Sequence, residues 1–328
     1  MTLRQLGCFV IWVAINRWGV EMLRLKLQDF ATEAGVGEKN TVSNGQDSGA
    51  NNQMAALFWN CMRHGTTSQA VDVGVSMVPF AASAGSPQTT SAGGMNIGGH
   101  GNEGLLETGM GQTGPYDVEK FMSLYNEYSW GPQLDRIRPT PITLISIWSC
   151  HTGAGQDGAD FLFDVAVRCG RAVRARTGFT YVNSQQIWFE ANSVWQVATP
   201  ANRPAPIQAP TPHFIPGAVA QIEVAGMDME PDQVTKLVIE RVDFKNVRSA
   251  VKSATDGAAA IVAKALFLPG AMEMDVEVMG FITATITLTF KGGTTATFDV
   301  YNDRLAIERG SKTGYYLKGQ LSKLYEML

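Results

Sequence analysis

The chain has 328 residues, of which 45% are hydrophobic, and it carries 26 basic against 30 acidic residues, for a net charge of −4. This length predicts one large domain with an appendage, or two domains of unequal size. Because the charge is slightly negative and no dense basic run occurs, there is no electrostatic reason to expect nucleic acid as a partner.

Four cysteines are spread along the chain without the close spacing of a disulfide framework: Cys8, Cys61, Cys150 and Cys169. A chain of this size needs no disulfides to stabilise its core, so we expect free thiols in a reducing compartment, which makes the protein cytoplasmic. The alternative is export without a clear cleaved signal peptide.

An apolar segment at residues 7–15 lies near the amino terminus. Only Arg4 precedes it as a basic residue, and no clear small-residue cleavage site follows. The segment is also much shorter than the roughly 20 residues of a membrane-spanning helix. Its apolar period continues to Leu27, so we expect a helix that packs on the core and no membrane span.

The chain before His100 alternates polar loops with short apolar segments. Residues 31–53 are rich in Gly, Asn, Ser and Asp, which predicts a mobile loop. A short helix is expected next, ending at His64, and residues 71–79 have the pattern of a strand. After another small-residue loop, residues 95–99 predict the strand that leads into His100.

The middle of the chain predicts alternating helices and strands. Apolar spacing favours a helix at residues 117–128, and another helix opens at Asp157, shortly after the strand that ends at Cys150. Residues 172–175 then predict a strand, and residues 187–197 a short hairpin. This order is typical of a mainly parallel sheet flanked by helices, the α/β fold class.

A proline-rich segment separates this part from the rest. Six prolines in residues 200–216 exclude a central strand or helix and favour an extended tether. We therefore expect an α/β domain at residues 1–199, a linker at 200–217 and a smaller α+β module at 218–328.

The expected C-terminal module has one strong pattern. Thr and β-branched residues alternate on either side of a Lys-Gly-Gly turn in residues 281–301, which predicts a β-hairpin. Residues 247–268 are rich in Ala with helical spacing, and the tail from Tyr315 predicts a helix.

Two residues indicate the chemistry of the first domain. His100 ends one apolar segment, and Cys150 ends another fifty residues later. Residues at the carboxyl ends of strands in an open α/β sheet face the crevice where ligands bind. Fifty residues accommodate a strand, a crossover helix and a return strand, so we expect the two side chains on adjacent parallel strands.

The pair predicts a cysteine nucleophile site. A thiol attacks a carbonyl as the thiolate, and a nearby imidazole takes its proton and later returns it to the leaving amine. These roles belong to Cys150 and His100. The backbone N–H groups of Gly101 and Cys150 are suited to bind the oxyanion, because glycine allows close approach of the chain.

The sequence around these residues resembles the caspase-like cysteine peptidases, the group that includes caspases, gingipains, clostripain and legumain. It is similar in particular to caspase-like domains of uncharacterised bacterial proteins. Four segments within roughly residues 70–200 carry the resemblance: His100–Leu106, Leu144–Gly155, Gly158–Leu162 and Val173–Gly178.

The resemblance implies a caspase-like fold and a cysteine endopeptidase that needs no cofactor and acts on a peptide or protein substrate. The dyad of the family corresponds to His100 and Cys150, and its oxyanion glycine to Gly101. Trp148 and Ser149 precede the cysteine, where caspases have Gln-Ala. No segment matches a known specificity pocket, and we expect Asp157, Glu190 and Trp148 to contact the substrate, the carboxylates favouring a basic side chain.

Other interpretations of the same residues remain. A buried cysteine is often an inert small hydrophobe, so the chain can instead be a catalytically inactive caspase-like binding or structural module. A different thiol-dependent acyl transferase or amidase is a third class. The glycine motifs at residues 99–104 and 109–114 open no clear apolar helix, which argues against a dinucleotide site.

Metal binding has little support in the sequence. Cys61 with His64, or His100 with Cys150 and His151, supply the right ligand types for zinc, but no second closely spaced pair completes a structural site. We therefore expect no metal, and we expect His151 to be exposed or to line the rim of the site.

Overall fold

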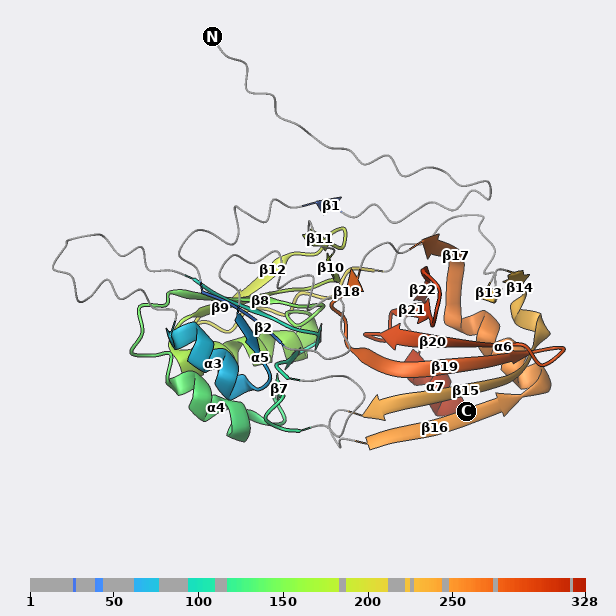
Figure 1. Ribbon diagram of the computed structural model, residues 1–328, viewed down its shortest axis with the longest axis horizontal. Helices are drawn as coiled ribbons and strands as arrows, with labels where there is room; N and C mark the ends of the chain where they lie inside the picture. Colours follow the sequence, from blue (N-terminus) through green and yellow to red (C-terminus); the bar gives the residue numbers. More distant parts are fainter. Residues whose placement is uncertain are drawn as a thin grey trace, which may run out of the picture.

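The computed structural model describes residues 26–27, 39–43, 62–76, 94–109, 117–182, 187–211, 222–224, 227–243, 248–273, 277–318 and 321–328. These residues form a mixed α/β structure with several sheets and few helices, in which most strand pairs are antiparallel. One part contains helices α3, α4 and α5, and the other is built on a large antiparallel sheet (Figure 1).

A six-stranded sheet organises the first part. Its strands, in spatial order, are β12 (Trp195–Ala198), β9 (Ala172–Arg176), β8 (Leu144–Trp148), β4 (Met95–Gly98), β2 (Lys39–Ser43) and β3 (Met62–His64). The four pairings from β9 to β3 are parallel, and β12 is antiparallel to β9. Among the named strands of the described chain, parallel pairs occur in this sheet alone, and most other strand pairs are antiparallel.

Three helices pack in series, with α4 (Glu127–Asp135) in contact with both α3 (Thr67–Ser76) and α5 (Gly155–Cys169). Alternate residues of β8 point to opposite faces of the sheet. Ile145 and Ile147 therefore join the core formed with Trp130 of α4 and Phe161 of α5, while Trp148 joins a different cluster. The three helices thus share one core with this face of the sheet.

Two small sheets lie at the end of the six-stranded sheet. One contains β5 (Gly101–Asn102), β6 (Leu105–Glu107) and β7 (Phe121–Ser123). The other contains β1 (Lys26–Leu27), β11 (Ile187–Phe189), β10 (Thr180–Val182) and β18 (Glu277–Val278). Because β18 comes from the C-terminal part and pairs with β10, strand pairing joins the two parts of the chain.

The C-terminal part is a seven-stranded antiparallel sheet. Its strands, in spatial order, are β16 (Arg248–Thr255), β15 (Val234–Asp243), β19 (Ile282–Phe290), β20 (Thr295–Tyr301), β21 (Leu305–Glu308), β22 (Thr313–Leu317) and β17 (Phe267–Glu273). A separate two-stranded sheet pairs β13 (Ile222–Val224) with β14 (Met227–Met229), and a 3-10 turn, η2 (Pro231–Gln233), leads into β15.

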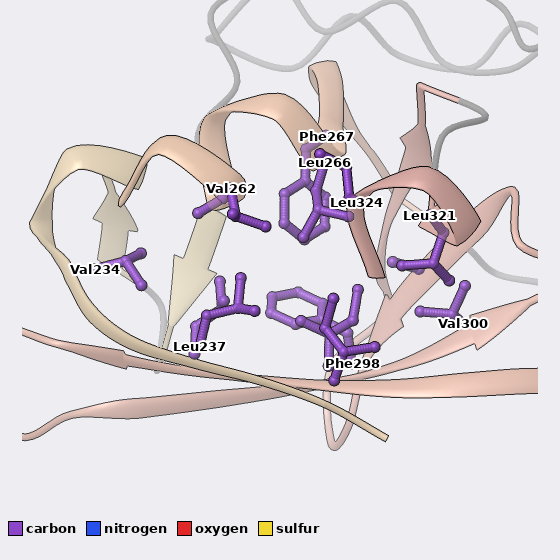
Figure 2. Close-up of a cluster of buried hydrophobic side chains, with 14 of the residues drawn as sticks. Val234, Leu237, Val262, Leu266, Phe267, Phe298, Val300, Leu321 and Leu324 are labelled. Atoms are coloured by element: carbon purple, nitrogen blue, oxygen red, sulfur yellow. The ribbon is translucent and has the colours of Figure 1, made fainter. Parts of the chain in front are cut away.

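Helices α6 (Asp256–Leu266) and α7 (Leu321–Met327) cover this sheet. Figure 2 shows Val262 and Leu266 of α6 and Leu324 of α7 pointing toward Leu237 and Phe298 of the strands. These side chains are buried, and burial of each contributes about 1.5–3 kcal/mol of hydrophobic stabilisation.

Several predicted elements are confirmed. The hairpin at residues 281–301 is β19 paired with β20, and Gly292 and Gly293 adopt the positive φ angles of its turn, 93° and 87°. The helix near Asp157 is α5, and residues 172–175 lie in β9. Helix α5 ends at Gly170 with φ 67°, which is the left-handed conformation that favours glycine.

Two predictions between residues 71 and 135 are wrong. Residues 71–76 belong to α3, in which Val71 and Gly74 are buried at helical spacing. The apolar residues of this segment also alternate, and that alternation is what predicted a strand. Residues 121–123 form β7, and α4 begins only at Glu127. The side chain of Asn126 accepts from Ser123 N–H at 2.8 Å and donates to the Phe121 carbonyl at 2.7 Å, which ends the strand in a turn.

Other predictions are wrong in their pairing or type. Strands β11 and β12 do not pair with each other, since β11 pairs with β10 and β12 with β9. The first half of residues 247–268 is β16, and the tail from Tyr315 contains β22 before α7. In the last two cases strand pairing overrides a local helical preference.

Part of the N-terminal prediction lies outside the described residues, including the segment at 7–15 and most of the loop at 31–53. The described pieces there are strands: β1, β2 and β3. Strand β3 replaces the helix end expected at His64.

The proline-rich segment, described up to Thr211, begins with a turn in which Thr199 and Asn202 form a bridge and then continues as neither helix nor strand. Ile207 anchors it, because its carbonyl accepts from Gly155 N–H at 2.8 Å and its own N–H donates to Gln196 Oε1 at 2.7 Å. Across the described part of the chain, no helix has the length and apolar character needed to cross a membrane.

Candidate functional site

His100 and Cys150 follow two neighbouring strands of the six-stranded sheet. Strands β4 and β8 are parallel, with Gly98 opposite Trp148. Each candidate residue comes two positions after that pair, so both lie at the same end of the sheet. Both are buried, His100 at 4% exposure and Cys150 at 0%.

The Cys150 thiol contacts the backbone of Thr180. Its sulfur accepts from Thr180 N–H at 3.1 Å and lies 3.4 Å from the Thr180 carbonyl oxygen, to which the S–H donates. Burial raises the pKa of the thiol well above its usual value, and the nearby carboxylate of Glu190 acts in the same direction. The thiol is therefore protonated in this conformation.

The His100 ring contacts a residue far along the chain. Its Nδ1 lies 2.7 Å from the carbonyl oxygen of Gly280. A carbonyl oxygen only accepts, so this nitrogen carries the proton. The histidine is thereby turned toward the segment between β18 and β19.

The two N–H groups expected to bind the oxyanion meet on one atom. Gly101 N–H and Cys150 N–H both donate to the carbonyl oxygen of Met279, at 3.1 and 3.2 Å. Glycine is required for this approach, since a Cβ on Gly101 would lie 2.7 Å from Cβ of Ser149 and closer still to the Thr152 hydroxyl. The pair of donors is thus formed and occupied by a peptide carbonyl.

The occupying segment, Glu277–Phe281, is hydrogen-bonded along its backbone. Strand β18 pairs with β10 in antiparallel register, and Met279 N–H donates to the Thr180 carbonyl at 3.0 Å. On the other side Phe281 N–H donates to the Gly101 carbonyl at 3.1 Å, and Gly280 forms a parallel bridge with Gly101. The segment therefore runs between the residue after His100 and the strand after Cys150.

Asn302, which follows β20 of the C-terminal sheet, hydrogen-bonds both Gly101 and the occupying segment. Its amide donates to the Gly101 carbonyl at 2.9 Å, and its Oδ1 accepts from Phe281 N–H at 2.7 Å. The backbone at Asn302 is left-handed, with φ 54°, and the side chain is 4% exposed. Asparagine tolerates this conformation better than most residues.

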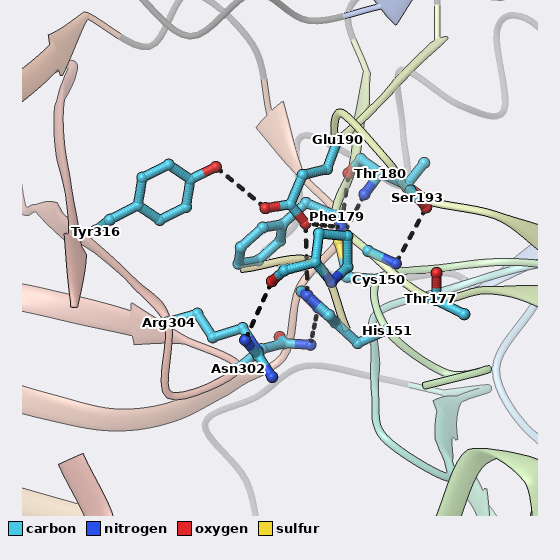
Figure 3. A network of polar contacts seen from close by, with 12 residues as sticks. Cys150, His151, Thr177, Phe179, Thr180, Glu190, Ser193, Asn302, Arg304 and Tyr316 are labelled. Carbon is cyan, nitrogen blue, oxygen red and sulfur yellow. Dashed lines mark hydrogen bonds and ion pairs between the residues drawn. The ribbon is translucent and has the colours of Figure 1, made fainter. Parts of the chain in front are cut away.

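A polar network borders the thiol on the other side. Figure 3 shows Glu190 between Tyr316 and Phe179. The Glu190 carboxylate accepts from Phe179 N–H at 3.0 Å and from the Tyr316 hydroxyl at 3.4 Å. Burial has the largest effect on the pKa of Glu190 and raises it. The two donors and the charge of Arg304 oppose this effect, and the net result is a pKa of about 7.

His151 completes this network and is fully buried, so the prediction that it is exposed or at the rim is wrong. The Asn302 amide lies 3.0 Å from His151 Nδ1, which accepts, and Nε2 lies 3.7 Å from Glu190 Oε2. Burial and the charge of Arg304 lower the pKa of His151, so the ring is neutral and its contact with Glu190 is no ion pair at neutral pH.

The three residues expected to contact substrate do not converge. Asp157 is exposed in the first turn of α5. Trp148 is buried, and its indole N–H donates to Asn96 Oδ1 at 2.8 Å. Glu190 lies in the network beside Cys150. Trp148 and Glu190 are therefore part of the buried surroundings of the thiol, whereas Asp157 is at the surface.

Sequence reasoning missed the residues from the C-terminal part: Met279, Gly280 and Asn302. The only local signal was the Asn302-Asp303 pair, which is typical of a turn and has positive φ at both residues, 54° and 56°. No sequence pattern relates these positions to His100 or Cys150.

The alternative sites gain nothing from the structure. Within the described residues no group of three or more His, Cys, Asp or Glu side chains is arranged to hold a metal, and Cys61 lies outside them. The glycines at residues 99–104 lead into β6, not into a helix, which contradicts a dinucleotide unit.

No protein-family model, curated protein or solved structure matches this chain.

Proposed function

We propose that the chain is a caspase-like cysteine endopeptidase, with Cys150 as nucleophile and His100 as the acid and base. The observation that carries the proposal is the pairing of two N–H groups, from Gly101 and Cys150, with the single carbonyl oxygen of Met279. Two donors that converge on one peptide oxygen provide what the tetrahedral intermediate of acyl transfer requires.

Two other features support the proposal. Strands β4 and β8 lie in the parallel part of the six-stranded sheet, which we take to be the caspase-like core. The His100 ring touches Gly280, the residue on the amine side of the peptide bond whose carbonyl is bound. The contact is to the Gly280 carbonyl oxygen, so the imidazole lies beside the residue whose nitrogen must accept a proton on cleavage.

The proposed chemistry is that of a Cys–His dyad. The imidazole removes the thiol proton, and the sulfur attacks the substrate carbonyl carbon, whose oxygen takes the electron pair and is held by the two N–H groups. The C–N bond then breaks, and the amine leaves with the proton from the imidazolium. Water, deprotonated by the same ring, hydrolyses the thioester to a carboxylate and restores the thiol.

One observation favours a second candidate, a catalytically inactive module that binds a partner through the same fold. The Cys150 thiol is fully buried, and it forms hydrogen bonds with both the N–H and the carbonyl oxygen of Thr180. An inert structural cysteine has the same kind of environment. The two candidates differ in whether the chain turns over peptides.

A peptide-library digest tests the proposal. Because Met279 occupies the two N–H groups, the library is offered to the wild-type chain and to Gly280→Ala, in which the new Cβ would lie 2.8 Å from Asn302 Oδ1 and displace the segment. We expect turnover that is lost in Cys150→Ser and retained in Cys169→Ser, which changes the other buried cysteine of the described residues.

Turnover that persists in the Cys150→Ser chain would refute the nucleophile assignment. If neither the wild-type chain nor Gly280→Ala cleaves any peptide, the endopeptidase proposal is refuted.

A further inference from the structure

The segment Glu277–Phe281 is bound as a substrate strand would be. The amino-terminal part of the segment is β18, which extends the sheet of β10 and β11. In its carboxyl-terminal part Gly280 forms a bridge with Gly101. Addition of an extended strand to a sheet edge is a general mode of peptide recognition, in which backbone hydrogen bonds hold the peptide and pockets select its side chains. The backbone contacts alone therefore fix which peptide bond faces the site.

That bond is Met279–Gly280. The carbonyl on its acyl side is the one held by Gly101 and Cys150, at 3.1 and 3.2 Å, and the residue on its amine side contacts His100 at 2.7 Å. The acyl half of the bond thus lies against the oxyanion donors, and the residue that supplies its nitrogen contacts the proposed acid through its carbonyl oxygen.

The side chains around the bond define what fits there. Met279 is fully buried and Val278 is 4% exposed, in a cluster that contains Trp148, Phe179 and Tyr316. An unbranched thioether fills an aromatic pocket of this kind well. On the other side of the bond a Cβ has no room, since Gly280 abuts Asn302 and Tyr301.

We propose that Met279–Gly280 is a self-cleavage site of this chain, and that the site accepts a long apolar side chain before the cleaved bond and glycine after it. The inference rests on the proposed endopeptidase function. It replaces the basic substrate side chain expected from Asp157 and Glu190 with an apolar one.

The reaction is the proposed one carried out within the chain. The Cys150 sulfur leaves Thr180, gives its proton to His100 and bonds to the Met279 carbonyl carbon. The Met279–Gly280 C–N bond breaks, and the Gly280 nitrogen leaves as a free amine with that proton. One water then hydrolyses the thioester, so the products are a Met279 carboxylate, a Gly280 amine and the restored thiol.

The two products are expected to stay together. The cut separates β15 and β17 from β19 and β22, yet β15 pairs with β19 and β17 pairs with β22 within the seven-stranded sheet. The cleaved protein should therefore elute as one species under native conditions and give two fragments after denaturation.

The test is time-resolved amino-terminal mapping of the full chain by mass spectrometry, alongside the peptide-library assay. We expect a new amino terminus at Gly280 in the wild-type chain, at least about 100-fold less in Cys150→Ser, and retention in Cys169→Ser. Gly257→Ala is the matched control for Gly280→Ala, because its added Cβ meets no atom within 4 Å. Gly280→Ala should lose self-cleavage and cleave library peptides faster, whereas Gly257→Ala should match the wild type in both assays.

The outcomes separate the inference from the proposed function. Library turnover by the wild type or Gly280→Ala without any cut at Gly280 overturns the self-cleavage site and leaves the endopeptidase intact. A cut at Gly280 that persists in Cys150→Ser also overturns it, because another protease is then responsible. Thermal unfolding of Cys150→Ser confirms that a loss of cleavage is not a loss of fold, and a chain inactive in both assays overturns both proposals.

Discussion

Asn302 lies 201 positions after Gly101, and its side-chain amide donates to the Gly101 carbonyl at 2.9 Å. The same side chain also contacts His151 and accepts from Phe281 N–H. One residue of the C-terminal sheet thus fixes the loop after His100, the residue after Cys150 and the segment that occupies the oxyanion donors.

We expect Asn302→Ala to lower the free energy of unfolding by about 2–4 kcal/mol, because buried polar groups lose a partner and alanine tolerates the positive φ poorly. Urea unfolding measures the change. Asn192→Ala is the matched control, since Asn192 also has a positive φ, 65°, but is exposed. Equal losses in the two variants would show that backbone strain alone is responsible.

The raised pKa of Glu190 predicts a pH dependence of stability. A carboxyl group with a folded pKa of about 7, against a usual value of 4.5, binds more protons in the folded state between these two values. Its contribution to stability is therefore full below about pH 4.5 and is lost as the pH rises to 7. Glu190→Gln, which mimics the protonated form, should be up to about 3 kcal/mol more stable than the wild type at pH 8, and equal to it at pH 4.5.

Urea unfolding at both pH values checks this expectation, with the exposed Glu119→Gln as control. The lowered pKa of His151 acts in the opposite sense, because the unfolded chain takes up its proton below about pH 6.5. The effect of His151 is common to the wild type and Glu190→Gln, so the difference in unfolding free energy between these two proteins isolates the effect of Glu190. A difference that does not grow with pH contradicts the assignment.

The buried thiols predict slow chemical labelling. Burial raises the pKa of Cys150, and it raises that of Cys169 to about 11, so both thiols should resist iodoacetamide at pH 8 while the chain is folded. In Gly280→Ala we expect faster labelling of Cys150 and no change at Cys169, which serves as the internal control. Peptide mapping by mass spectrometry distinguishes the two sites, and rapid labelling of Cys150 in the folded wild type would contradict the closed geometry.

Gly101→Ala should destroy the pair of N–H donors. The added Cβ overlaps Ser149 and Thr152, and relief of the overlap moves the loop away from Cys150. We expect a loss of about 1–3 kcal/mol in stability and loss of peptide cleavage. Gly257→Ala, with open space around the new Cβ, should instead be neutral or more stable by up to about 1 kcal/mol. Retained cleavage in Gly101→Ala would exclude Gly101 from the oxyanion site.

Local patterns predicted the elements whose side chains repeat with one clear period. The alternation in residues 281–301 led to β19 and β20, and the apolar face between Asp157 and Gly170 led to α5. Predictions failed where two periods fit equally, as at Val71 in α3, or where a side chain such as Asn126 terminates a strand. At Val71 packing against the core, and at Asn126 hydrogen bonds from a single side chain, outweigh a local preference of a few tenths of a kcal/mol per residue.

For the candidate site, the sequence by itself determined which residue types end two apolar strands: a histidine followed by glycine, and a cysteine. Only the tertiary structure decided what lies between them, namely Met279, Gly280 and Asn302, and how deeply the thiol is buried. The physical reason is range. Strand periodicity is written in adjacent residues, whereas strand pairing, exclusion of water and the pKa values that depend on it arise from segments more than a hundred positions apart that meet only in the folded chain.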